Sequence, residues 1–235
     1  GATGGYRVEG RNGVSGALIW SANTDYVTPP RNWIPPYSPL LTPQGRLYVQ
    51  GAGGKLLMRT DGDATSGNLT PQVFYGATSY NTNPAAFDAT VFINTPLTAD
   101  AQGNIFFGFQ VTGTNPAGLV SGIARVTPNG SGTWFGVAAA AGDPTIVPVM
   151  NCAPALSNDG TTIYIAANRG ATSATQNGVL LALDSTTLAT RASVALLDPN
   201  LGGPARLSDD GTAAPVVGPD GRVFYGVLER TFGTH

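Results

Sequence analysis

The stretch that decides the fold is residues 151–188, NCAPALSNDGTTIYIAANRGATSATQNGVLLALDSTTL. A short apolar pair precedes the polar turn 157–160, Ser-Asn-Asp-Gly, and the alternating run Ile-Tyr-Ile follows at 163–165. Asp-Gly between two strand-like runs is a strong hairpin signal, because glycine adopts the positive φ angle that such turns need. After a loop, a further apolar strand ends in Asp-Ser-Thr-Thr at 184–187. The stretch therefore predicts three consecutive antiparallel strands.

The same unit recurs along the chain at a nearly constant spacing. A proline, a short strand, a turn with glycine and an alternating strand begin at Pro39, Pro96, Pro154 and Pro215. The turn glycines 45, 103, 160 and 221 follow one another at 58, 57 and 61 residues. A period of this size with strand-type content is typical of stacked four-stranded units, and radial stacking of such units is a β-propeller.

The repeat predicts an all-β chain of four-stranded antiparallel blades without a long helix, in one domain of 235 residues. We expect three blades at about 38–76, 93–138 and 152–196, and a split blade formed by 213–228 with 5–20. The segments between them, about 22–37, 77–92, 139–151 and 197–212, are expected to be long loops. The apolar stretch 134–141 is expected to be the end of a strand.

Two arrangements of the split blade remain open. Its halves pair with each other and close a ring of four blades, or the chain is a segment of a ring of seven or eight blades. Four is at the low end of known blade numbers, and the tail 230–235 is followed by nothing that could form a third strand. We therefore expect the larger ring, with open strand edges that self-associate or bind a partner chain.

The composition disfavours several classes of protein. The net charge is −2 and no basic run occurs, so the electrostatic footprint of nucleic-acid binding is absent. No apolar run approaches the ~18 residues that indicate a membrane span. A single cysteine cannot form an internal disulfide. The Thr-, Asn- and Gly-rich, Lys-poor composition favours an exported protein, extracellular or periplasmic.

The turn between the third and fourth strands carries a repeated pattern. The quinoprotein-type propeller repeat has Ala-x-Asp-x-x-Thr-Gly-x-x-x-Trp at this place. One copy here has Ala182, Asp184 and Thr187, with Leu188 and Ala192 at the Gly and Trp positions. A second copy has Gly16 and Trp20 at the Gly and Trp positions, with Gly10, Asn12 and Ser15 at the Ala, Asp and Thr positions. The third copy has Ala124, Gly130 and Trp134 at the Ala, Gly and Trp positions. The chain therefore resembles the quinoprotein-like (PQQ-type repeat) β-propeller superfamily over most of its length.

The resemblance implies a fold more than a chemistry, since the motif ties two strands together and its Trp docks on the neighbouring blade. Catalytic members of the superfamily hold the quinone PQQ under a disulfide of adjacent cysteines, beside a calcium ion bound by carboxylate and Asn side chains. Cys152 stands alone in this chain, so that disulfide cannot form. We expect a non-catalytic member without a cofactor; PQQ with calcium is the alternative.

Three further features are better explained by structure than by chemistry. His235 is the only histidine and is terminal, which disfavours Ser-His-Asp catalysis and histidine zinc sites. Cys152 is expected to be a buried packing residue. Residues 61–67, DGDATSG, begin like a calcium loop but have Ser66 and Gln72 where such a loop has its glycine and its bidentate Glu, so a solvated turn is expected.

The long loops are all expected on one face, where binding residues collect on a rigid scaffold. Ligand-binding candidates on this face are Arg31, Trp33, Tyr37, Tyr80 and Arg169. Each inter-blade loop also holds an acidic candidate: Asp25, Asp88, Asp143 and Asp198. If these converged they could bind a cation or form a carboxylate pair, although Asp is common in loops for turn reasons alone.

These features together favour a non-catalytic binding or interaction module with a protein or glycan ligand on the long-loop face. Two enzyme classes remain as alternatives: a PQQ-dependent oxidoreductase, and a carbohydrate-active enzyme that uses the loop carboxylates.

Overall fold

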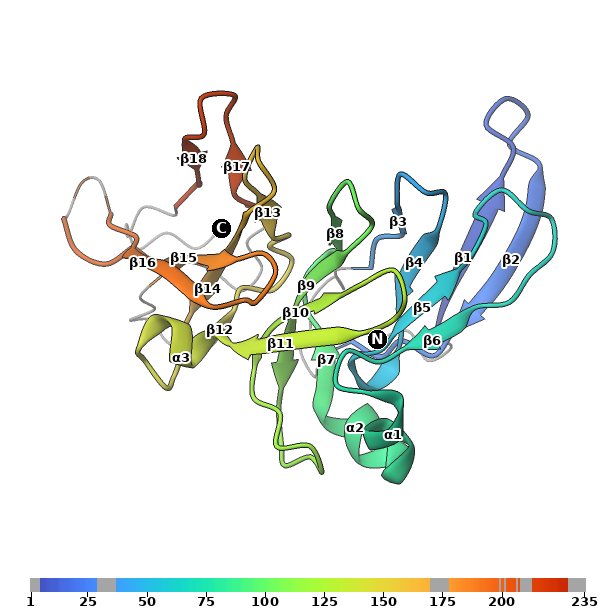
Figure 1. The fold of residues 1–235 in the computed structure, drawn as a ribbon, viewed down its shortest axis with the longest axis horizontal. Coiled ribbons are helices and arrows are strands. Elements are labelled where there is room, and N and C mark those ends of the chain that lie inside the picture. The colour runs from blue at the N-terminus through green and yellow to red at the C-terminus, as the bar shows by residue number, and fades with distance from the viewer. Residues whose placement is uncertain are drawn as a thin grey trace.

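A computed structural model describes residues 5–28, 37–169, 178–198, 200, 202–205, 207 and 213–227. The described chain is built mainly from short antiparallel strands in five small sheets that follow one another in chain order (Figure 1). The predicted all-β class is confirmed. The longest described helix has seven residues, which agrees with the expected lack of a long helix.

The sheets reproduce most of the predicted blade boundaries. The first sheet pairs β1 (Tyr6–Arg11) with β2 (Leu18–Thr24), and the second runs β3 (Leu40–Leu41), β4 (Leu47–Gln50), β5 (Leu56–Arg59), β6 (Thr70–Gln72). The third contains β7 (Val91–Ile93), β8 (Thr98–Ala99), β9 (Ile105–Val111), β10 (Gly122–Val126) and β11 (Gly132–Gly136). The fourth contains β12 (Val147–Pro148), β13 (Ala155–Leu156), β14 (Thr162–Asn168), β15 (Val179–Asp184) and β16 (Thr190–Ala195), and the fifth pairs β17 (Val216–Val217) with β18 (Val223–Phe224).

The four repeated hairpins share one turn geometry. Gly45, Gly103, Gly160 and Gly221 have φ angles of 76, 82, 71 and 80°. The N–H of each donates to the carbonyl three residues earlier, at 2.9, 3.1, 2.8 and 2.9 Å. The predicted positive φ at the four turn glycines is therefore confirmed, and it is the reason why these turns contain glycine.

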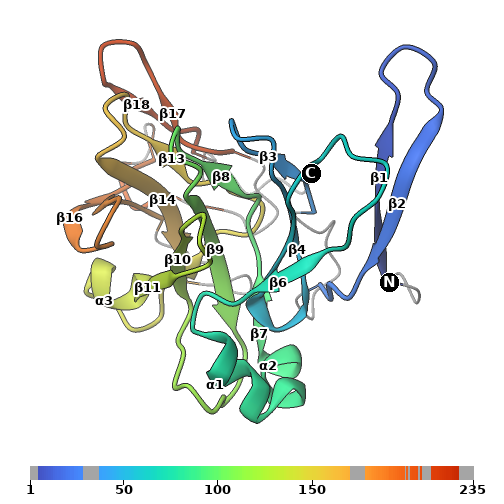
Figure 2. The same cartoon turned by 45° about the vertical axis from the view of Figure 1, so that its right-hand side comes forward.

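Side chains link each of these hairpins to the next. Gln44 donates to the carbonyl of Ala101 at 3.0 Å, Thr98 to that of Pro154 at 2.6 Å, and Asn158 to that of Gly218 at 2.8 Å. The four hairpins therefore lie side by side, and Figures 1 and 2 show them along the upper side of the molecule.

The core lies between consecutive sheets. Buried clusters join the first sheet to the second around Trp20, the second to the third around Phe74, and the third to the fourth around Ile163. A fourth cluster packs Tyr225, which follows β18, against Cys152 and against Ala166 of the fourth sheet. The second, third and fourth sheets therefore pack against a neighbour on either side, and the sheets follow one another around an arc (Figure 1).

Three short helices replace expected loop and strand segments: α1 (Ala77–Thr82), α2 (Pro84–Thr90) and α3 (Val137–Ala141). In the segment expected to be a plain loop, the Asn83 side chain caps α2 by accepting from the Ala86 N–H at 3.2 Å, and Pro84 occupies the start of the helix. The expected strand end at 134–141 is confirmed for 134–136, which end β11, and corrected for 137–141. Its alanines form α3, which ends at Gly142 with a left-handed φ of 68°.

Two of the three partial quinoprotein motifs share one turn. The carboxylate or amide oxygen of Asp184 and of Asn12 accepts from the backbone N–H groups two and three residues later, at 2.8–3.0 Å. The residue four positions later has a left-handed φ in both, 71° at Gly16 and 60° at Leu188. A register shift precedes each turn. Leu188 thus adopts the backbone conformation for which the motif has glycine.

The third partial copy, at 124–134, has a shorter turn. Its tryptophan, Trp134, points to the opposite face of the sheet from the one that the motif alignment implies. Thr127 closes this turn with Ser131, and strands β10 and β11 pair without a register shift. Because successive strand residues point to opposite faces, a difference of one residue turns the side chains to the other face. Trp134 consequently faces back toward the second sheet, whereas Phe135 packs toward the fourth.

The two halves of the expected split blade do not pair within the described residues. Strands β1 and β2 pair only with each other, as do β17 and β18. The two hairpins lie at opposite ends of the arc in both views (Figures 1 and 2). No closed ring is seen in the described part of the chain.

Candidate functional site: the Lys55 cluster

The helices α1 and α2 and the connection between β9 and β10 lie on the side of the molecule opposite the four repeated hairpins (Figures 1 and 2). The side chain at the centre of this side's polar contacts is Lys55, the only lysine of the chain. It ends the tight turn 51–55 between β4 and β5, and its side chain is only 7% exposed. A buried ammonium is stable only when acceptors surround it, so its partners identify the groups that the fold has brought together.

The Lys55 Nζ has three oxygen partners from two distant segments of the chain. It lies 2.6 Å from Asp25 Oδ2, 2.8 Å from the Tyr80 hydroxyl and 3.9 Å from Asp88 Oδ1. The ammonium also lies 4.6 Å from the centre of the Tyr80 ring, within cation–π range. We call Asp25, Lys55, Tyr80 and Asp88 the Lys55 cluster.

The two carboxylates are held from several directions. Asp25 Oδ1 accepts from the Ala52 N–H at 3.1 Å, and Asp88 Oδ1 accepts from the Tyr80 hydroxyl at 3.0 Å. The backbone approaches closely here: a Cβ on Gly53, whose φ is 66°, would lie 2.6 Å from Asp88 Oδ1. Although their inner oxygens are bound, the Asp25 and Asp88 side chains remain 51% and 37% exposed. The cluster thus presents two fixed, solvent-facing carboxylates.

The surroundings of Lys55 hold it in the charged form. Burial alone would lower the pKa of its amine, but the hydrogen bonds to Asp25 and Tyr80, together with the negative charges of Asp25 and Asp88, outweigh it. The net effect is a pKa above the ordinary value. A lysine fixed as an ammonium stabilises charge and is not available as a nucleophile or a base.

The structure distributes the sequence-predicted site residues over different environments. Tyr80, Asp25 and Asp88 meet in the Lys55 cluster. Tyr37 packs instead in an aromatic group, stacked on Tyr6 with the ring centres 4.8 Å apart. Arg31 and Trp33 lie outside the described residues.

The remaining candidates do not reach this cluster. Arg169 pairs with Asp143, Nη2 to Oδ2 at 2.9 Å. Asp198 is buried within its own turn, where it accepts from the Asn200 N–H at 2.8 Å. Of the four loop carboxylates, only Asp25 and Asp88 therefore come together in the described structure.

Sequence reasoning missed Lys55 itself, although a signal was present. A single lysine in a chain of this length, placed in the glycine-rich turn GAGGK, is an unusual position for a cation. Its partners lie 25 to 33 positions away in sequence, and no local pattern connects them.

No group of three or more His, Cys, Asp or Glu side chains within the described ranges is arranged to hold a metal ion. Of the loop carboxylates, Asp25 is bound to Lys55 and Asp143 to Arg169.

Comparisons with known proteins give no family. No protein-family model matches the chain, and no curated protein matches it. Among solved structures, it is similar to a luciferin-regenerating enzyme at 16% identity over 88% of this chain, with a TM-score of 0.47. It is also similar to an endo-1,4-beta-xylanase from Bacteroides thetaiotaomicron at 11% identity over 80% of this chain, with a TM-score of 0.37. The chain spans 58% and 63% of the lengths of these two proteins.

The loop that begins like a calcium loop is organised around a guanidinium. Arg59 donates to the carbonyls of Asp61, Ala64, Ser66 and Gly67 at 2.5–3.0 Å. The turn is solvated as expected, since most of residues 61–67 are exposed, and four of its carbonyls also surround the buried Arg59 side chain. The loop is a structural link between strands.

Cys152 is completely buried beside Tyr225, in agreement with the predicted packing role. Burial raises the pKa of its thiol to about 11, so the reactive thiolate is scarce near neutral pH.

We expect iodoacetamide to leave the Cys152 thiol of the native protein unlabelled at about pH 8. The same reagent should label Cys152 stoichiometrically at a denaturant concentration that unfolds the chain completely. Mass spectrometry reads the result directly, because the chain has one cysteine. Rapid labelling of the native protein would contradict the burial.

Proposed function

We propose that this chain is a segment of a β-propeller of the quinoprotein-like type and acts as a non-catalytic, exported binding module. Its ligand is a hydroxyl-rich molecule, a glycan, bound on the long-loop face at the Lys55 cluster. The observation that carries the proposal is the buried Lys55 ammonium, which fixes Asp25 and Asp88 in place while both carboxylates stay open to solvent.

The propeller part of the proposal rests on the repeated geometry. Four hairpins with the same turn lie side by side, and each consecutive pair of sheets shares a buried cluster. Two turns between third and fourth strands also share the Asx-type bonding of Asn12 and Asp184. Radial stacking of such sheets is the propeller arrangement.

Pre-organisation favours binding as the role of the cluster. A carboxylate that is already fixed by an ammonium and a backbone N–H loses little freedom when a ligand arrives, and this lowers the entropic cost of binding. Asp25 is fixed in this way by Lys55 and Ala52. Asp88 is fixed by Tyr80 and Lys55.

The Lys55 ammonium weakens the attraction of the two carboxylates for a second cation. A second cation brought onto Asp25 or Asp88 would lie a few ångströms from the Lys55 ammonium. Two like charges about 4 Å apart repel by ~1–4 kcal/mol, depending on the local dielectric. Sugar hydroxyl groups donate to the same carboxylate oxygens without this repulsion, so a glycan is preferred over a basic protein segment.

The proposal predicts which substitutions weaken glycan binding. On a glycan array, the wild-type protein is expected to bind a defined set of glycans, and Asp25→Asn and Asp88→Asn are each expected to weaken that binding about tenfold or more. The reason is the loss of one charge-assisted hydrogen bond, worth ~1.5–3 kcal/mol. Asp220→Asn is the matched control, because Asp220 lies in the hairpin turn between β17 and β18 and pairs with Arg222.

Other outcomes of the same experiment have definite meanings. A folded wild-type protein that binds no glycan overturns the glycan proposal, and equal binding by all variants moves the site away from the Lys55 cluster. Cleavage of a bound glycan that is lost in Asp88→Asn would indicate the carbohydrate-active enzyme. Turnover of alcohols or sugars with added PQQ, calcium and an electron acceptor would indicate the oxidoreductase.

A further inference from the structure

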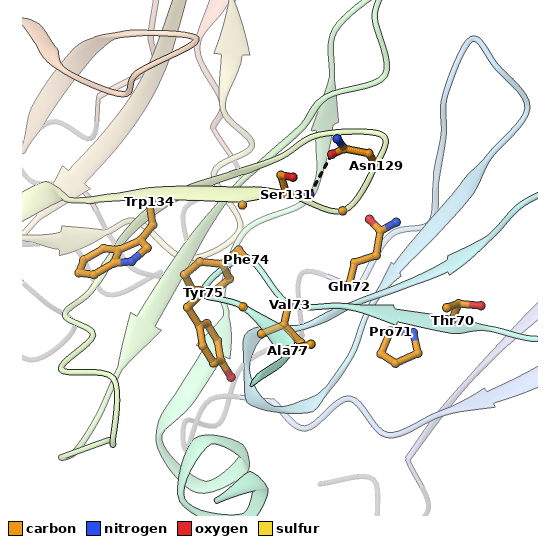
Figure 3. A pocket seen from close by; sticks show the side chains of 13 residues that line it. Thr70, Pro71, Gln72, Val73, Phe74, Tyr75, Ala77, Asn129, Ser131 and Trp134 are labelled. Atoms are coloured by element: carbon orange, nitrogen blue, oxygen red, sulfur yellow. Dashed lines mark hydrogen bonds between the residues drawn. The ribbon is translucent and has the colours of Figure 1, made fainter. Parts of the chain in front are cut away.

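A second feature of the molecule, separate from the Lys55 cluster, is a groove between the second and third sheets (Figure 3). One wall is the segment 70–77, which continues from β6 toward α1, and the other is the turn 129–132 with Trp134 of β11. The groove has a volume of about 640 Å³, which lies within the ~300–1,000 Å³ typical of small-ligand sites.

The groove results from the short turn of the third motif copy. Because that turn lacks the register shift of the other two, Trp134 points toward the second sheet. At Gly132 the two walls touch: a Cβ on this residue would lie 1.9 Å from the Phe74 carbonyl oxygen, so only glycine fits. The half-buried Trp134 ring contacts Phe109 edge to face, with centres 6.2 Å apart. A rigid aromatic wall is thus built into the groove.

The polar groups of the groove are all uncharged. Its walls combine Trp134 and Tyr75 with the side chains of Thr70, Gln72, Asn129 and Ser131, and contain no Asp, Glu, Lys, Arg or His. The Gln72 side-chain oxygen is buried and has no hydrogen-bond partner among the described residues. A buried acceptor without a partner is costly, and a donor from a bound molecule would satisfy it.

We propose that this groove is a second binding site, which takes one or two rings of a neutral oligosaccharide. The apolar face of a sugar ring packs on Trp134, and ring hydroxyl groups donate to Gln72 and exchange hydrogen bonds with Asn129 and Ser131. A charged sugar would enter without a countercharge. A peptide strand added to the edge of β6 would meet Pro71, which has no N–H to donate. This site goes beyond the proposed function, because it shares no residue with the Lys55 cluster.

The test is a calorimetric titration of the whole chain with maltotetraose, cellotetraose, mannotetraose and chitotetraose, each in turn. We expect at least one of them to bind, Trp134→Ala to weaken that binding at least tenfold, and Gln72→Met to weaken it several-fold. Trp134→Phe, which keeps an aromatic face, should retain most of the affinity. Thr133→Ala is the matched control, since Thr133 neighbours Trp134 on β11 but does not line the groove.

The outcomes separate this inference from the proposed function. Binding that is lost in Trp134→Ala and unchanged in Asp25→Asn supports the groove as an independent site. Binding that is lost only in Asp25→Asn overturns the groove and leaves the Lys55 cluster as the glycan site. No binding of any of the four sugars, or equal binding of an acidic oligogalacturonate, also overturns it. Equal melting temperatures of the variants confirm that they are folded.

Discussion

Replacing Arg59 with methionine is expected to lower the free energy of unfolding by about 3–4 kcal/mol. The Arg59 residue is only 3% exposed, and its guanidinium donates to four carbonyls of residues 61–67. The same guanidinium lies 4.2 Å from the centre of the Trp20 ring, which belongs to the first sheet. Methionine fills a similar volume but satisfies none of these carbonyls.

The loss of stability in Arg59→Met extends beyond Arg59, because the loop 61–67 also contacts the first sheet. Trp20 Nε1 donates to the Gly62 carbonyl at 2.9 Å, so a loop released from Arg59 also loosens Trp20. Lysine has a single ammonium in place of the planar five-donor fork, and Arg59→Lys should therefore recover little of the lost stability.

Urea unfolding followed by circular dichroism measures the effect. The control is Arg222→Met, since the Arg222 side chain is 79% exposed and its pair with Asp220 is at the surface. Its expected change is below ~0.5 kcal/mol. A loss of less than about 1 kcal/mol in Arg59→Met would show that the loop carbonyls are solvated equally well without the guanidinium.

The repeated hairpins could be predicted from sequence because their determinants are local. A turn glycine with positive φ and its flanking strand residues lie within a few positions of one another, as at Gly103 and Gly160. The same locality explains two errors. The Asn83–Pro84 cap and the alanine run before Gly142 are helix signals inside segments that the repeat had assigned to loop or strand.

The sequence pattern does not specify features that change when a turn is longer or shorter by one residue. Aligning the three motif copies on their glycine placed Trp20 and Trp134 in one role, but the absent register shift in the third copy turns Trp134 to the opposite face. Leu188 shows the converse, since its left-handed φ follows from the Asp184 turn although the residue is not glycine. Local bonding, rather than residue identity, decided both conformations.

The candidate site was predicted in part, for a physical reason. The long loops were expected to share one face, and this brought Asp25, Asp88 and Tyr80 into consideration together. What unites them is the Lys55 ammonium, which contacts Asp25 after β2, Tyr80 in α1 and Asp88 in α2. Contacts of this kind depend on the packing of sheets against one another, which a strand pattern does not specify.

Replacing Lys55 with methionine is expected to lower the free energy of unfolding by about 2–3 kcal/mol. This loss is smaller than that for a fully buried ion pair, because solvent screens the partly exposed carboxylates of Asp25 and Asp88. The substitution leaves the two carboxylates facing each other without the ammonium that balanced them. Adding Asp25→Asn to Lys55→Met should therefore recover part of the loss, whereas Asp220→Asn, far from the cluster, should recover none.

The pH dependence gives an independent check on the charge of Lys55. Because its pKa is raised in the folded protein, the stabilisation is fully present below the ordinary lysine value of about 10.4 and is lost as the pH rises through the folded-state pKa. The stability difference between wild type and Lys55→Met, measured by urea unfolding, should thus be constant from about pH 7 to 9 and narrow near pH 11. A difference that stays constant to high pH would mean that the Lys55 side chain stabilises the turn by packing alone. The proposed binding site would then lack the fixed charge that organises its carboxylates.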